Sequence, residues 1–295
     1  MRHTLSTEWF WIRHRLAAHL AALLAAVIAV AVPVGRWIST HGDLDAAIAK
    51  AHDDAAESLA IWGVEVPAEA VFVEPRYPLA EQLPLDVAAV AVAVALIGLV
   101  AAALLVGGEW RTGTVRLSFT DPAQRGRPTA ARILTCWWGW TAVAAILLGI
   151  TAGGLLLVGQ QRGLTEGMTV TRAVFPLLRG IIIAGLGALL GAALGTIFRS
   201  GTVVIVLLLV YVIVAEIVLL GLGVGTGYHS PGSRLLQWLV SADGQLLPYA
   251  CGGAMRCSEL YVITAGPPLA YLAAAMTACL ATVAAVIAAR RPIWR

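Results

Sequence analysis

The chain has 295 residues, of which 59% are hydrophobic and 13% are charged, and its mean hydropathy is +0.84. Soluble domains carry about 25% charged residues, so this composition excludes an ordinary soluble domain and indicates a protein embedded in lipid. The formal charge is only +3, and the arginines lie at the ends of apolar stretches rather than in one patch. Nucleic acid is therefore not an expected partner, whereas membrane lipid is.

Six apolar stretches are long enough to cross a hydrocarbon core of about 30 Å as helices. The predicted spans are 16–37, 86–106, 131–158, 174–198, 202–223 and 267–289. We expect an all-α polytopic membrane protein with a single transmembrane domain over 1–295. Its outer loops would be 38–85, 159–173 and 224–266, and a cytoplasmic loop would cover 107–130. The first stretch is too long for the apolar core of a cleavable signal peptide.

Arginines set the expected orientation. They precede the first span, fill the loop after the second, occupy the short turn Arg199–Gly201 and end the chain, whereas 38–85 is rich in aspartate and glutamate. Positive charge collects on the cytoplasmic side of membrane proteins. The sequence thus predicts a multi-pass protein of the cell membrane with both termini in the cytoplasm.

Two amphipathic helices are predicted in the first third of the chain. At 6–16, Ser6 can cap a helix whose Trp9 and Phe10 enter the lipid interface. In the first outer loop, apolar residues recur at helical spacing and predict a short helix packed on the outer ends of the spans; they are Leu44, Ile48, Ala51, Ala55 and Leu59.

A short charged segment, GGEWRTGTVRLSFTDPAQRGRP at 107–128, separates the second and third spans. Trp110, Thr114, Leu117 and Asp121 recur at helical spacing, so one face can lie on the membrane while charged groups face the cytosol. Such a helix can dock a soluble partner. The alternative is an interfacial helix that only anchors positive charge.

This segment resembles the E-x-x-x-G-T…P…R element of type-2 ATP-binding-cassette (ABC) exporter permeases, with Glu109, Gly113, Thr114, Pro122 and Arg125 at the matching positions. Arg132 stands where the family often has a lysine. The resemblance implies a coupling helix that docks into a separate ATPase chain. The implied coupling residues are Glu109, Arg111, Gly113, Thr114, Arg116 and Leu117.

The same resemblance implies six spans, an interfacial N-terminal helix that touches the ATPase and a second permease chain, identical or different. The chain itself has no G-x-x-x-x-G-K-[ST] loop for nucleotide phosphates. ATP and Mg²⁺ would therefore bind the partner ATPase, and no cofactor is expected on this chain. H-E-x-x-H and G-x-S-x-G are missing too, so we predict neither a catalytic nor a metal site, and no enzyme.

Glu216 lies within an apolar run, where an ionised carboxylate requires a partner. The short turn at 199–201 makes the fourth and fifth spans a hairpin that brings Arg179 to a similar depth, within about 6 Å. We expect either an Arg179–Glu216 pair that holds the hairpin, or a Glu216 that lines the transport path. A third alternative is that Glu216 extends toward the outer surface.

Small residues and cysteines give two further expectations. Gly187, Gly191 and Gly195 form a face that another helix can approach closely, and we favour packing within one chain over a subunit interface. Cys251 and Cys257 share the last outer loop and are expected to form a disulfide, the alternative being free thiols. In the same loop, RLLQWLV at 234–240 is expected to be a re-entrant or surface helix.

Two other functional classes remain as alternatives to a permease. One is a membrane-anchored accessory or sensor protein that binds a ligand through its outer loops. The other is an intramembrane enzyme, which the missing catalytic motifs disfavour.

Overall fold

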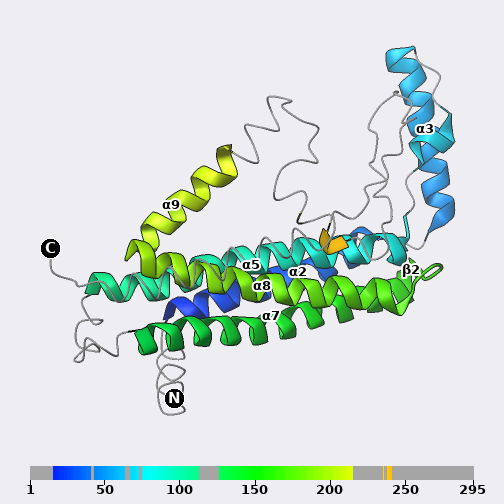
Figure 1. Cartoon of the computed structure of the whole chain (residues 1–295). Coiled ribbons are helices and arrows are strands. Elements are labelled where there is room, and N and C mark those ends of the chain that lie inside the picture. Colours follow the sequence, from blue (N-terminus) through cyan, green and yellow to red (C-terminus); the bar gives the residue numbers. More distant parts are fainter. Residues whose placement is uncertain are drawn as a thin grey trace.

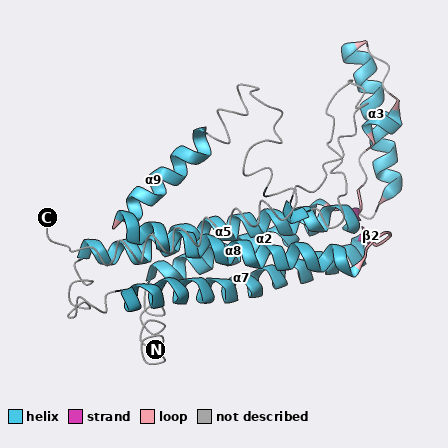
Figure 2. Cartoon of the chain, viewed as in Figure 1, coloured by secondary structure: helices cyan, strands magenta, loops and turns pink. Residues whose placement is uncertain are grey.

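The computed structural model describes residues 16–40, 43–63, 67–72, 75–112, 126–214, 235 and 238–240. These residues are mostly helical (Figure 2). The elements in chain order are α2 (Leu16–Ser39), α3 (Leu44–Trp62), α4 (Ala68–Val71), β1 (Tyr77–Pro78), α5 (Leu79–Thr112), α7 (Gly126–Arg162), β2 (Gly163–Leu164), α8 (Val170–Phe198) and α9 (Gly201–Tyr211).

Four of the described helices, α2, α5, α7 and α8, are long and apolar enough to cross a membrane. They lie side by side in one bundle (Figure 1). The prediction of a helical, membrane-embedded protein is confirmed at this level. The first four predicted spans coincide with these helices, although each helix extends beyond the predicted span at one end or both.

The fifth predicted span, 202–223, begins one residue after the start of α9 at Gly201. An apolar helical stretch runs from Gly201 to Val214, and α9 leaves the bundle at an angle (Figure 1). Residues 215–223 and the whole sixth span at 267–289 lie outside the described residues, as do residues 6–15 of the interfacial helix expected at 6–16.

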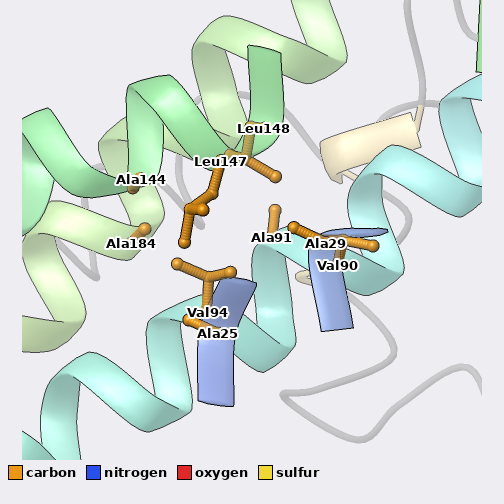
Figure 3. Close-up of a cluster of buried hydrophobic side chains, with 9 residues drawn as sticks. All are labelled: Ala25, Ala29, Val90, Ala91, Val94, Ala144, Leu147, Leu148 and Ala184. Carbon is orange, nitrogen blue, oxygen red and sulfur yellow. The ribbon is translucent and has the colours of Figure 1, made fainter. Parts of the chain in front are cut away.

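The centre of the bundle is built largely from small side chains. Figure 3 shows one buried cluster in which α2, α5, α7 and α8 meet. Alanine lets helix backbones approach closely, which is how helices associate where lipid removes the usual hydrophobic drive. The members of this cluster are Ala25, Ala29, Val90, Ala91, Val94, Ala144, Leu147, Leu148 and Ala184.

The three predicted packing glycines of α8 all face α5. A Cβ on Gly187, Gly191 or Gly195 would meet the carbonyl oxygen of an α5 residue, which is Ala95, Leu99 and Ala103 respectively. The partner numbers rise together, so α5 and α8 run parallel with their backbones in contact. The glycine face is thus occupied within the chain.

Gly191→Ala is expected to lower the free energy of unfolding by about 1–3 kcal/mol, because the new methyl group would overlap the Leu99 carbonyl and force the two backbones apart. Gly153→Ala on α7 is the matched control, since nothing lies within 4 Å of a Cβ there. Thermal and denaturant unfolding in detergent measures both variants. Equal stability of the two would show that the α5–α8 contact is loose.

The predicted helix of the first outer loop is present as α3, but its predicted packing is wrong. Asp43 caps its start by accepting a hydrogen bond from the Ala46 amide at 3.1 Å, and Gly63 ends it with φ 64°. The helix stands away from the bundle (Figure 1) and packs on α4. Much of its apolar face is alanine and buries little area, and Ile48 and Leu59 stay exposed.

Candidate functional site

The candidate coupling segment is bounded by the last turn of α5 and the first turn of α7. Residues 113–125, and with them Gly113, Thr114, Arg116 and Leu117, lie outside the described residues. Arg111 belongs to the helical backbone of α5. The structure therefore describes how the segment is held at its two ends, and these ends are fixed by charged and aromatic residues.

Glu109 and Arg132 form an ion pair between α5 and α7. Arg132 Nη1 donates to Glu109 Oε2, and Glu109 is only 2% exposed, while the side chain of Arg132 is 14% exposed. A buried carboxylate requires such a partner. Glu109 thus faces the inside of the chain, and the pair connects the two helices that enter and leave the coupling segment.

The turn between α8 and α9 packs against the same end of α5. Only Arg199 and Ser200 separate the two helices, as the short predicted turn requires, and Arg199 has a left-handed φ of 53°. Its guanidinium lies 4.9 Å from the centre of the Trp110 ring, a cation–π contact. Gly107 touches the backbone of Gly201 so closely that no side chain would fit.

At the opposite end of the bundle, Arg36 of α2 is joined to Asp86 of α5 by two hydrogen bonds. Nε and Nη2 of Arg36 donate to the two carboxylate oxygens at 2.8 and 2.7 Å. The buried Tyr77 hydroxyl donates to the same carboxylate at 2.8 Å. Burial raises the pKa of Tyr77 far above its ordinary value and Asp86 raises it further, so the phenol keeps the proton that it donates.

A second arginine at this end holds the C-terminus of α2. Arg162, the last residue of α7, donates to the carbonyl oxygens of Trp37 at 2.8 Å and Thr40 at 3.2 Å. Its guanidinium also lies 3.9 Å from the centre of the Trp37 ring. The last carbonyl groups of a helix have no hydrogen-bond donors within the helix. Here the guanidinium of Arg162 is the donor. The strands β1 and β2 pair in parallel beside it.

The two ion pairs bracket the apolar part of α5. At 1.5 Å per residue, Asp86 and Glu109 are about 35 Å apart along the helix. A bilayer core is about 30 Å thick. Each pair therefore lies near one membrane boundary, where its charges can be buried against protein while lipid surrounds the helices between them.

Arg179 of α8 lies at the same end of the bundle as Asp86, because the α5–α8 register places it beside the first turns that follow Asp86. Its Nη1 donates to the Trp238 carbonyl oxygen at 2.7 Å, and its guanidinium lies 5.6 and 5.0 Å from the ring centres of Phe175 and Trp238. Glu216 is outside the described residues, so its pairing with Arg179 stays a prediction.

The described part of 234–240 is helical and lies against α5 and α8 (orange in Figure 1). Leu239 is fully buried against Ala88 and Ile183. This position favours a segment seated on α5 and α8 at the end of the bundle that carries Asp86.

Among the cysteines, Cys136 is buried in α7, while the predicted disulfide partners Cys251 and Cys257 lie outside the described residues. Within the described ranges, no group of histidine, cysteine, aspartate or glutamate could hold a metal ion.

Comparison with known proteins gives no relative: no family model matches the chain, and no curated protein sequence matches it. The fold and the contacts at the two ends of the bundle define the class of protein: a helical, membrane-embedded protein in which α5 contacts each of the other long helices.

Proposed function

We propose that the chain is the permease subunit of an ABC exporter of the cell membrane, with both termini in the cytoplasm. Two permease chains would enclose the translocation path, and each would dock a separate ATPase that binds ATP and Mg²⁺. The residues that support this form the E-x-x-x-G-T…P…R element, which begins with Glu109 near the end of α5 and ends with Arg125 just before α7. The sequence contains no phosphate-binding loop of its own.

The observation that carries the proposal is the buried Glu109–Arg132 pair. A segment that transmits force must be joined firmly to the helices it moves. The pair ties both ends of the segment together, and α5 contacts α2, α7, α8 and α9 in turn. A displacement of 113–125 would therefore reach α5 and α7 directly, and the other helices through their contacts with α5.

This geometry changes the role proposed for Glu109. Its carboxylate faces Arg132 rather than the cytosol, so we assign it to positioning the coupling segment. Contact with the ATPase would fall to the residues that follow on the segment, which are Arg111, Gly113, Thr114, Arg116 and Leu117.

Arg116→Glu is expected to reduce the amount of ATPase that co-purifies with the chain by at least about tenfold, because the variant places a negative charge on the docking surface. Lys50→Glu on α3 is the control, since it makes the same charge reversal outside the segment. Quantitative mass spectrometry of affinity-purified complexes from the native host measures the ratio. Absence of any ATPase from the unaltered complex would refute the proposal.

The accessory or sensor function is the second candidate, and α3 is the observation that favours it. This helix projects from the bundle at the end opposite the coupling segment and carries most of its acidic residues toward solvent. The same purification separates the two functions, because a sensor would co-purify without an ATPase and Arg116→Glu would change nothing.

A further inference from the structure

Pro33 lies inside α2 and removes one hydrogen bond from that helix. Proline has no amide hydrogen, so the carbonyl of Ala29, four residues earlier, has no donor within the helix. The Thr151 hydroxyl on α7 approaches this oxygen at 3.0 Å. A freed carbonyl inside a membrane is tolerated when a neighbouring threonine supplies the proton.

The contact between α2 and α7 is shaped around this proline. A Cβ on Gly154, one turn beyond Thr151, would come within 2.9 Å of the Pro33 ring, so glycine provides the space that the ring occupies. Thr151 Oγ1 is also 3.0 Å from the Leu147 carbonyl of its own helix. The hydroxyl has one proton and two acceptors at equal distance, so this hydrogen bond can pass from one helix to the other.

The two halves of α2 on either side of this point are held very differently. The outer end is fixed by the Arg36–Asp86 pair and by Arg162, which holds the last carbonyls. On the inner side, Ala25 and Ala29 pack in the buried cluster of Figure 3, but none of the described residues Leu16–Leu24 is buried, and Leu20 and Leu23 are more than half exposed.

We propose that α2 is a hinged helix, with a fixed outer part from Pro33 to Ser39 and an inner part that tilts about the Ala29–Pro33 turn, with the largest displacement over Leu16–Leu24, the residues before the buried Ala25. The missing amide removes resistance to bending. Thr151 sets the resting position by donating to Ala29 and releases it by donating to Leu147. The hinge is a property of this chain alone and does not rest on the proposed function.

Double electron–electron resonance on the full chain in lipid nanodiscs tests the hinge without any ATPase. Spin labels at Leu20 and Phe198 report the inner ends of α2 and α8, and labels at Ile38 and Val174 report their outer ends. All four sites are exposed, and the native cysteines are replaced by alanine. The inner distance distribution is expected to be about twice as wide as the outer one.

Three variants connect that width to the hinge. Pro33→Ala restores the amide and is expected to narrow the inner distribution to the width of the outer one. Thr151→Val removes the hydroxyl and is expected to widen it, whereas Thr151→Ser keeps the donor and leaves it unchanged. Gly35→Ala, a position with nothing within 4 Å of a Cβ, is the control for general stiffening of α2.

The proposal is overturned if the inner distribution of the unaltered chain is as narrow as the outer one. It is overturned equally if Pro33→Ala has no more effect than Gly35→Ala. Should Thr151→Val fail to fold, the comparison of Pro33→Ala with Gly35→Ala still decides the outcome.

Discussion

Glu109→Ala is expected to lower the free energy of unfolding by about 3–5 kcal/mol, because it leaves the guanidinium of Arg132 buried without its counter-charge. The reciprocal change, Arg132→Ala, is expected to be at least as harmful, since Glu109 is the more deeply buried partner. Chemical unfolding in detergent micelles measures both variants.

A double variant separates the charges from the packing. Glu109→Met with Arg132→Met replaces the pair by apolar side chains of similar length, and such replacements of buried ion pairs are often neutral. We expect the double variant to recover most of the stability lost in either single one. Glu57→Ala on the exposed face of α3 is the control and should change stability by less than about 0.5 kcal/mol. A loss below about 1 kcal/mol in Glu109→Ala would mean that solvent screens the pair.

The positions of the long helices were predictable from the sequence, because an apolar segment in lipid must be helical. The four long apolar runs coincide with α2, α5, α7 and α8 because a stretch that must satisfy all of its backbone groups in lipid has to be helical. Their ends were not predictable from hydropathy. α5 begins at Leu79, well before the span predicted at 86–106, because a helix continues into the polar layer, where residues such as Glu81 are compatible with it.

The contacts of the candidate site depended on residues far apart in the sequence. Hydropathy put Arg36 and Asp86 at the ends of the predicted spans 16–37 and 86–106, yet their pairing across 50 positions follows from how α2 and α5 pack. The sequence did contain a signal for this pairing, because Arg36 and Asp86 carry opposite charges and stand at the same end of two consecutive antiparallel predicted spans.

The family motif presented Glu109 as a surface residue. Its burial depends on α7, which the motif does not include. The helical periodicity of α3 was likewise correct, but a periodic pattern does not specify which partner covers the apolar face. The exposed position of α3 therefore required the structure.

The outer ion pair gives the second large expected effect, and its two partners should differ. Arg36→Ala is expected to lower the free energy of unfolding by about 3–5 kcal/mol, because the carboxylate of Asp86 is only 10% exposed and would keep only the Tyr77 hydroxyl of its described partners. Chemical unfolding in detergent is again the measurement.

Asp86→Ala should lower stability less, by about 1–3 kcal/mol, because the side chain of Arg36 is 38% exposed and can extend its guanidinium to water at the membrane boundary. Arg172→Ala is the control, because this half-buried arginine at the same end has no ion pair among the described residues and donates to the Gly167 carbonyl oxygen. The order of the two stability losses is the decisive result. If Asp86→Ala were the more harmful variant, the guanidinium of Arg36 could not reach water. Arg36 would then lie within the hydrocarbon core of the membrane and not at its boundary.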